Sequence, residues 1–409
     1  MEKNNNKPKL RFPGFTDPWE QRELNECIET SNEKNSDNVY TKEDVLSVSG
    51  DFGIVNQIEL QGRSFAGASV SNYGVVNTGN IVYTKSPLKR NPFGIIKTNK
   101  GKSGIVSTLY AVYKPKENTN PNFVQCYFES DYRLNKYLKP LVNKGAKNDM
   151  KVSDDNALLG LVIFPSYEEQ TEISAFLEIL DNLITLHQRK LNHLQDKKKS
   201  LLQKMFPKNG EDFPELRFPG FTDPWERRKV GELLIERNTQ APKSDEYPLM
   251  AFVAYEGVAP KGDRYNREFL VSDEDNKKYK QTEYGDFIYS SNNLTTGSIG
   301  LNKYGKASIS PVYSIFQPTE LADSDFIGRV LVRKSFINQM IRWRQGVIYG
   351  QWRIHESDFV KMEAQAPSVV EQKQIGDFFN NLDGLIILHQ RKLNHLQEQK
   401  KALLQQMFV

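Results

Sequence analysis

Cysteine is scarce in this chain of 409 residues, which contains only Cys27 and Cys126. Two cysteines exclude a disulfide framework and a zinc site made of cysteine ligands. The five histidines, at positions 187, 193, 355, 389 and 395, include no pair spaced four residues apart. A zinc site of the kind that two such histidines form on one helical face is therefore excluded as well. The sequence predicts no metal site.

Long apolar runs are also missing. No run approaches the roughly 20 residues that cross a bilayer, and the opening MEKNNNKPKL lacks the apolar core of a signal peptide. Apolar residues at 38% and charged residues at 26% are typical of an ordinary globular protein. The length allows about two or three domains. We expect a cytoplasmic protein.

Catalytic motifs are absent too. Gly101, Lys102 and Ser103 resemble the end of a phosphate-binding loop, but the glycine required five residues earlier is Ile96. No glycine-rich cofactor fingerprint follows a strand, and no Asn-Pro-Pro-aromatic or Asp-Pro-Pro-aromatic sequence of the amino-methyltransferase kind is present. The sequence therefore predicts no catalytic residues and no cofactor in this chain. Acidic nuclease motifs are too degenerate to exclude, which leaves an enzyme as an alternative.

What the chain does contain is a duplication. LRFPGFTDPWE, here named the FPGF motif, occupies residues 10–20 and recurs unchanged at 216–226. Residues 165–206 match residues 367–408 at 27 of 42 positions. A repeat of this kind organises the whole chain. We expect a tail with the first FPGF motif (1–20), a first block (21–164), a central helix (165–206), a linker with the second FPGF motif (207–226), a second block (227–366) and a C-terminal helix (367–409).

The two blocks are similar in layout but not in letters. GNIVYTKS and STLYAVYKP in the first, and GDFIYSSNN and SPVYSIFQP in the second, have the alternation and the flanking Gly, Pro and Asn of strands. A helical stretch follows in each, at 123–138 and 326–341. These patterns predict two α+β domains that have diverged from one plan. Such a pair suits a ligand with two similar ends that differ in detail.

The repeated segments have a heptad seam over more than four repeats, with no proline inside. A helix of about 40 residues would expose this stripe if it were alone, so we expect the two copies to pair. The seam residues are Ile173, Leu177, Leu180, Ile184, His187, Leu191, Leu194, Lys198, Leu201 and Met205 in the first copy, and Ile375, Phe379, Leu382, Ile386, His389, Leu393, Leu396, Lys400, Leu403 and Met407 in the second.

Charge predicts the direction of this pair. Residues 165–186 have five acids and no base, and residues 187–206 have six bases and one acid; the second copy repeats the trend more weakly. Antiparallel packing sets acidic halves beside basic halves and favours the helix dipoles. We expect two antiparallel coiled-coil helices related by a pseudo-twofold axis, with a block at each end. The polar seam residues either set the register or mark a seam that opens for partner helices.

The net charge of +4 does not by itself indicate a nucleic-acid partner, but its distribution does. Residues 85–102 have six bases and no acid, and residues 340–353 have three arginines among aromatic residues. Arg and Gln read base edges, whereas Lys more often holds phosphate. The candidate DNA-binding residues are Lys85, Lys89, Arg90, Lys97, Lys100, Lys102, Lys144 and Lys147 in the first block, and Ser290, Asn292, Asn293, Thr295, Arg342, Arg344, Tyr349, Gln351 and Arg353 in the second.

Each of these candidates has a plainer interpretation. A lysine-rich loop is usually only solvated, and Trp343 and Trp352, taken singly, are expected to lie in a core. The DNA-binding interpretation of the two basic segments is favoured because they belong to equivalent blocks.

The motifs resemble those of a known family. PKLRFPGFTDPWE and PELRFPGFTDPWE resemble the start of each half of a type I restriction-modification specificity subunit. The helices that begin PSYEEQTEI and PSVVEQKQI and continue to LHQRKLNHLQ resemble its two conserved regions. The resemblance covers the chain in order. It implies that the blocks are target-recognition domains, each reading one half of a bipartite, asymmetric DNA site, with the helices as the ruler between them.

The resemblance also implies partners. Two methyltransferase subunits would dock on the helices, carry S-adenosylmethionine and methylate adenine, while restriction subunits using ATP and Mg would cleave unmodified double-stranded DNA. This chain would then be non-catalytic. Half-sites about one helical turn (~10 bp) apart are expected of such a reader.

Two other classes remain as alternatives. An enzyme would modify or cleave DNA alone, and a coiled-coil scaffold that binds only protein would show no salt-dependent DNA binding. For the FPGF motif, our hypothesis is that its Phe, Pro and Trp residues pack where a block meets the helices.

Overall fold

The computed structural model describes residues 6–85, 88–142, 152–208, 210–260, 277–346 and 351–409. The chain divides into two compact units. Unit 1 comprises Met1–Gln188 with Arg391–Val409, and unit 2 comprises Arg189–Gln390. Each unit therefore contains one block, the beginning of the long helix that follows it and the end of the other long helix.

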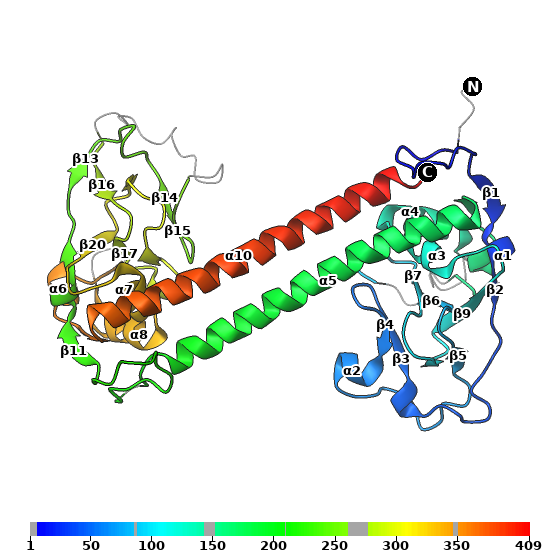
Figure 1. The fold of residues 1–409 in the computed structure, drawn as a ribbon, viewed down its shortest axis with the longest axis horizontal. Coiled ribbons are helices and arrows are strands. Elements are labelled where there is room, and N and C mark those ends of the chain that lie inside the picture. The colour runs from blue at the N-terminus through cyan, green and yellow to red at the C-terminus, as the bar shows by residue number, and fades with distance from the viewer. Residues whose placement is uncertain (1–5, 86–87, 143–151, 209, 261–276, 347–350) are drawn as a thin grey trace. The chain divides into compact units, whose positions relative to one another are not determined.

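Unit 1 has one main antiparallel sheet in the order β2–β9–β6–β7 (Figure 1). Strands β3 and β4 form a hairpin, β5 pairs with β8, and β1 pairs with β10. Its elements before the long helices are β1 (Glu20–Glu23), α1 (Leu24–Cys27), β2 (Ile28–Thr30), β3 (Leu46–Ser49), β4 (Gly53–Asn56), α2 (Gln57–Gln61), β5 (Gly74–Val76), β6 (Ile81–Thr84), β7 (Ile95–Thr98), β8 (Gly104–Val106), β9 (Tyr110–Pro115), α3 (Pro121–Tyr127), α4 (Asp131–Leu138) and β10 (Leu161–Phe164).

Unit 2 repeats this plan, with a main sheet in the order β12–β20–β17–β18. Strands β14 and β15 form a hairpin, β13–β16–β19 form a second sheet, and β21–β22 and β11–β23 pair. Its elements are β11 (Glu226–Lys229), α6 (Val230–Leu233), β12 (Leu234–Glu236), β13 (Gln240–Ala241), β14 (Ala251–Val253), β15 (Gly257–Ala259), β16 (Tyr279–Thr282), β17 (Phe287–Tyr289), β18 (Ile299–Leu301), β19 (Ala307–Ile309), β20 (Ser314–Pro318), α7 (Ser324–Leu331), α8 (Lys334–Arg342), β21 (Gln345–Gly346), β22 (Trp352–Arg353), α9 (Glu356–Phe359) and β23 (Glu363–Ala366).

The predicted α+β class is confirmed, and the strand-like runs form the central strands of both sheets. Each predicted helical stretch is two helices, α3 and α4 or α7 and α8. In unit 1 the second helix begins at Asp131 and is capped by Ser130, whose hydroxyl accepts a hydrogen bond from the Arg133 amide. A serine in this position satisfies an otherwise unpaired amide at the helix start.

The main sheets are buried on both faces. In unit 1, Ile81 and Tyr83 of β6 join the cluster that includes α3 and the long helices, while Val82 joins a second cluster on the other face. In unit 2, Phe287 and Tyr289 face one cluster and Ile288 the other. A strand covered on both sides needs apolar residues at consecutive positions, which accounts for these runs.

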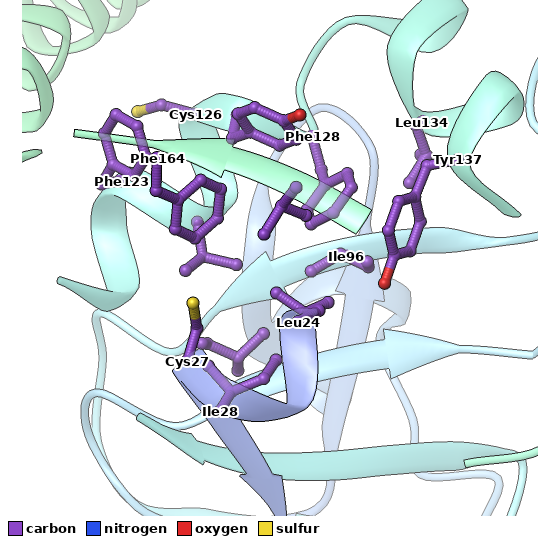
Figure 2. Close-up of a cluster of buried hydrophobic side chains, with 14 of the residues drawn as sticks. Leu24, Cys27, Ile28, Ile96, Phe123, Cys126, Phe128, Leu134, Tyr137 and Phe164 are labelled. Atoms are coloured by element: carbon purple, nitrogen blue, oxygen red, sulfur yellow. The ribbon is translucent and has the colours of Figure 1, made fainter. Parts of the chain in front are cut away.

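Both cysteines lie in the larger core of unit 1 and are free (Figure 2). Burial raises the pKa of the Cys126 thiol to about 12 and also raises the pKa of Cys27. A thiol that stays protonated behaves as a small apolar side chain. The two cysteines are therefore packing residues.

The long helices are α5 (Tyr167–Lys204) and α10 (Val369–Gln406). Both follow a Pro-Ser pair, and the hydroxyls of Ser166 and Ser368 accept from the amides of Glu169 and Glu371. Unit 1 combines the beginning of α5 with the end of α10, and unit 2 combines the reverse parts. The helices are thus antiparallel, as their charges predicted. Every residue of the predicted seam is buried or half-buried.

The FPGF motif joins each block to the helices. Trp19 packs against Phe123 and Phe408, with ring centroids 6.0 and 6.1 Å apart. Trp225 packs against Phe326 and Phe206 at 5.3 and 5.8 Å. Phe12 and Phe218 pack against Phe176 and Phe378 of the long helices. The hypothesis that this motif packs where a block meets the helices is thus confirmed for its Trp residues and its first Phe, and it is wrong for the prolines, which are exposed in both copies.

An ion pair completes this joint. The Arg11 guanidinium donates two hydrogen bonds of 2.7 Å to Glu169, at the start of α5. Arg217 and Glu371 make the same pair at the start of α10. Strand β1 begins at the end of the motif, and it pairs with β10, which directly precedes α5. The chain therefore enters and exits the block through two neighbouring strands. The FPGF motifs and the long helices together are here named the frame.

Candidate nucleic-acid interface

Three predicted lysines of unit 1 are engaged or buried. The Lys85 ammonium lies 2.9 Å from Asp154, and that of Lys100 lies 3.1 Å from Glu178 on α5. Lys97, in the middle of β7, is 8% exposed. Lys85 and Lys100 therefore contact carboxylates within the protein, and Lys97 is buried in the sheet, which the sequence alone did not indicate.

The Lys100 contact has a counterpart in unit 2. Lys303 contacts Asp325 and Asn380, and position 380 on α10 is the repeat equivalent of Glu178 on α5. In both units, a lysine just after the strand pair β6–β7 or β17–β18 reaches a long helix. The pairs attach the sheet to the frame.

Three other candidates of unit 1 are exposed. Lys89 and Arg90 lie on the loop between β6 and β7, and Lys102 lies just after β7. Lys144 and Lys147 lie outside the described residues. Among the predicted unit 1 candidates that the structure describes, Lys89, Arg90 and Lys102 are exposed to solvent.

A cleft of about 880 Å³ lies in unit 1 between the block and the long helices. Arg90, Lys97 and Lys100 line it together, so the structure brings three of the predicted cations to one place. The hairpin β3–β4 and the start of α4 form part of its wall. Its other charged lining residues are Lys400 and Lys401, and the acids Asp51, Glu129, Asp131, Glu178 and Asp181.

In unit 2 the structure brings two distant predicted segments together. The Trp352 amide donates to the Asn292 side chain at 2.5 Å, and the Ile354 amide donates to the Ser291 hydroxyl at 3.0 Å. The loop after β17 thereby lies against the β21–β22 hairpin. Within the loop Asn292, Asn293 and Thr295 are exposed, whereas Ser290 is buried.

The unit 2 arginines differ in their surroundings. Arg353 is 56% exposed beside Glu356 at 3.7 Å, and Gln351 is exposed. Arg344 buries Nε and Nη2 without a hydrogen-bond partner among the described residues, and burial lowers the pKa of its guanidinium. Arg342, at the end of α8, lines a different pocket of about 420 Å³. Tyr349 lies outside the described residues.

The expectation that Trp343 and Trp352 lie in a core is wrong. They are 40% and 49% exposed. Trp343 follows the end of α8, and Trp352 is in a short hairpin, β22. Neither indole ring belongs to the core clusters that the described residues of unit 2 form.

Sequence reasoning missed two further aromatic residues. Phe52 and Tyr255 are 69% and 84% exposed, and they lie in the turns of the hairpins β3–β4 and β14–β15. The available signal was an aromatic residue close to a glycine in a short turn, in GDFG (50–53) and AYEG (254–257).

The lysines of the helix seam are paired. In unit 1, Lys400 lies between Asp181 of α5 and Glu129, the latter at 2.7 Å. Burial lowers the pKa of the Lys400 ammonium, but the two carboxylates raise it more, so the net direction is upward.

Unit 2 has the converse arrangement. Lys198 of α5 lies 2.6 Å from Asp383 of α10, and Arg329 lies 2.9 Å from the same carboxylate. These pairs favour the interpretation that polar seam residues set the helix register.

The long helices also carry a second, exposed apolar row, here named the outer seam. In unit 1, Ile179, Leu183 and Leu186 of α5 are 61%, 40% and 45% exposed. In unit 2, Leu385 and Leu388 of α10 are 47% and 46% exposed, and they are the repeat equivalents of Leu183 and Leu186. Apolar residues at heptad spacing on an exposed helix face are typical of a contact with another helix.

Among the described residues, no group of three His, Cys, Asp or Glu side chains is placed to hold a metal ion. No helix in the described part of the chain is long and apolar enough to cross a membrane.

Comparison with known proteins connects these features to a family. The family model for the type I restriction modification DNA specificity domain matches residues 222–398. The S subunit of a type-I restriction-modification system from M. genitalium has 12% identity and a TM-score of 0.56, covering 98% of this chain and 99% of that chain. The HsdS subunit from Thermoanaerobacter tengcongensis has 16% identity and a TM-score of 0.42, with 97% of each chain covered. Comparison with curated proteins finds no significant match.

The matched region runs from the second FPGF motif through the second block and far into α10. Unit 1 has the same motif, sheet order and helix contacts, and the fold similarity extends over the whole chain. Residues 222–398 are therefore similar to the type I restriction modification DNA specificity domain, and the whole chain has the fold of a type I S subunit.

Proposed function

We propose that each block reads one half of a bipartite, asymmetric DNA site, and that the chain thereby directs adenine methylation and cleavage by its partner subunits. One observation carries this proposal. Two blocks with the same sheet order are attached to a repeated frame through the same contacts, yet the residues that they expose differ. Two blocks that are placed equivalently but expose different residues suit duplex DNA, because the backbone is the same at both half-sites while the base sequence differs.

The exposed residues suggest different roles for the two blocks in DNA binding. In unit 2, Asn292, Asn293, Gln351 and Arg353 are side chains that make directed hydrogen bonds to base edges. In unit 1, Lys89 and Lys102 suit phosphate contacts that position the protein, and Arg90 suits either role. We assign the readout of sequence to these exposed loops rather than to Lys85 and Lys100, which have carboxylate partners.

The outer seam supports the proposal of two methyltransferase subunits. It occurs once in each unit at equivalent helix positions, so two copies of one partner can bind in the same way. These partners would carry S-adenosylmethionine, and restriction subunits would use ATP and Mg. This chain would contribute the surface that directs these subunits to a specific DNA sequence.

The proposal is tested by co-expression with the methyltransferase partner and mapping of methylated adenines at base resolution. The expected result is one two-part motif with a constant gap. Exchange of residues 27–164 for another block should alter only one half of it. No methylation, or methylation without a motif, together with the absence of salt-dependent DNA binding, would favour a scaffold that binds only protein.

A further inference from the structure

Each unit presents an exposed aromatic ring from an equivalent hairpin. The pairs Ser49–Gly53 and Val253–Gly257 each close a turn of three residues, Gly50–Phe52 and Ala254–Glu256. Strand β4 lies beside β7, and β15 lies beside β18, its counterpart in the other sheet. The rings of Phe52 and Tyr255 therefore occupy corresponding places in two blocks that have diverged in sequence.

Tyr255 is held in its place by an uncommon backbone conformation. Its φ is +64°, and among the described non-glycine residues only Asn38 shares a positive φ. This region is unfavourable for a bulky side chain, and such strain clusters at functional sites. The Tyr255 amide donates to the Gly297 carbonyl at 3.0 Å, which fixes the turn against the loop after β17.

Gly297 provides the space for the Tyr255 ring. A Cβ atom at position 297 would lie 2.6 Å from ring carbons of Tyr255. The ring thus rests on the same loop that exposes Asn292, Asn293 and Thr295. An 84% exposed ring is placed beside the polar residues that are candidates for base contacts.

In unit 1 the Phe52 ring lies at the cleft of about 880 Å³, which Arg90 and Lys97 also line. Tyr132 on the same cleft is 77% exposed. The cleft is lined by acids as well as bases, so its charge alone does not select an occupant. A phenyl ring kept in water loses the benefit of burial, and it gains that benefit when an apolar surface covers it. Stacked bases on a phosphate backbone are such a surface.

We propose that Phe52 and Tyr255 are base-packing residues, each inserting its ring against a base step of the half-site that its block reads. This inference rests on the proposed function. Aromatic and apolar side chains that enter a groove partly unstack a step and bend the duplex. Because steps differ in how easily they deform, each ring adds specificity that hydrogen bonds alone do not supply.

The test uses the complex of the full chain with its methyltransferase subunits and the variants Phe52→Ala and Tyr255→Ala. Binding to a duplex containing the mapped site is measured by fluorescence anisotropy, beside a scrambled duplex at the same salt. Each variant is expected to bind the site about tenfold more weakly, the loss expected for one base-packing contact. Binding to the scrambled duplex should change by less than about twofold, since phosphate contacts are intact.

Matched controls come from exposed aromatic residues elsewhere in the blocks. Phe65 is 56% exposed, and Tyr284, at the opposite end of β17 from the loop, is 60% exposed. Phe65→Ala and Tyr284→Ala should leave both affinities within about twofold of the wild type. Site binding by Phe52→Ala and Tyr255→Ala that equals the controls would overturn the proposal.

Two further measurements distinguish a failure of this inference from a failure of the proposed function. On the methylation map, Phe52→Ala should relax only one half of the motif and Tyr255→Ala only the other. A wild-type map without a two-part motif contradicts the proposed function, whereas a normal wild-type map that both variants reproduce contradicts this inference alone. Tyr255→Phe should keep wild-type affinity, and a loss equal to that of Tyr255→Ala would overturn the role of the ring.

Discussion

The two units use one frame to present different surfaces, and their tryptophans show the division. Trp19 and Trp225 occupy the same position of the FPGF motif and are 2% and 3% exposed. Trp343 and Trp352 occur in unit 2 alone and are 40% and 49% exposed. The duplicated residues lie at the joint between block and helices, and the residues without a counterpart lie directly after α8 and in the short strand β22. A block can therefore change its surface without changing how it is attached.

A second difference lies inside the frame. In unit 1 one cation, Lys400, lies between two carboxylates, Asp181 and Glu129. In unit 2 one carboxylate, Asp383, lies between two cations, Lys198 and Arg329. The long helices have the same Asp and Lys in both units, and the third charge comes from α7 in unit 2 and from the residues after α3 in unit 1. Equivalent substitutions should thus have unequal effects.

The largest effect is expected at the joints. Trp19→Ala and Trp225→Ala should each lower the free energy of unfolding by about 4 kcal/mol, because each removes a buried aromatic ring from a packed cluster. Both together should also weaken assembly with the proposed methyltransferase subunits. Urea unfolding and a pull-down measure these losses.

The matched control for this prediction is Trp343→Ala, which removes the same side chain from an exposed position. It should change the free energy of unfolding by less than about 0.5 kcal/mol. Equal losses for buried and exposed tryptophans, or unchanged assembly of the double variant, would show that the joint does not depend on these rings.

The next effect concerns the seam lysines. Lys400→Met removes the cation that contacts both Asp181 and Glu129 and should destabilise unit 1 by about 3 kcal/mol. Lys198→Met leaves Asp383 its contact with Arg329 and should destabilise unit 2 by only about 1 kcal/mol. Urea unfolding of the two variants compares them directly, and a larger loss for Lys198→Met would reverse the comparison.

The pH dependence of Lys400→Met sharpens this test. Burial already raises the pKa of Asp181 above its ordinary value, and removal of Lys400 raises it further. A carboxyl with a raised folded-state pKa binds its proton more tightly in the folded state. The stability lost in this variant should therefore return as the pH falls from 7 toward the ordinary aspartate pKa of about 4.

A smaller contrast is expected at two equivalent glycines. Gly94 and Gly297 both have positive φ, +96° and +92°. A Cβ atom at Gly94 would lie 1.8 Å from the Thr84 carbonyl oxygen, whereas at Gly297 it would meet the exposed Tyr255 ring. Backbone cannot move aside, but an exposed ring can.

Gly94→Ala should therefore destabilise unit 1 by about 2 kcal/mol more than Gly297→Ala destabilises unit 2. Thermal unfolding compares the two variants. Equal losses would show that strain at positive φ, which both share, outweighs the clash.

Sequence alone predicted the parts of this fold that local patterns specify. Heptads from Ile173 to Met205 predicted a paired helix, and charge predicted its direction. Strands β6 and β17 followed from short apolar runs between Gly and Lys or Asn. These signals lie within a few residues of the element that they specify.

The candidate site was less predictable because its contacts join distant segments. Nothing near Lys100 indicates Glu178, 78 residues later, and nothing near Asn292 indicates the amide of Trp352. Phe52 and Tyr255 share a place only through the pairing of hairpins whose sequences differ. The exposure of a side chain also depends on which elements cover it. Local sequence does not specify this, so the prediction that Trp343 and Trp352 lie in a core was wrong.

The smallest expected effect separates lysines that attach a block to the long helices from those that we propose to contact DNA. Lys89→Ala should reduce the affinity for any duplex and lower the slope of log K against log salt by about 1, because one phosphate contact is lost. Lys100→Ala should leave that slope unchanged, since its ammonium already pairs with Glu178, and should lower stability by less than about 1 kcal/mol. Lys303→Ala is the matched control in unit 2. If Lys100→Ala lowered the slope as much as Lys89→Ala, its ion pair would have to open when DNA binds, and the attachment of the sheet to α5 would itself respond to the ligand.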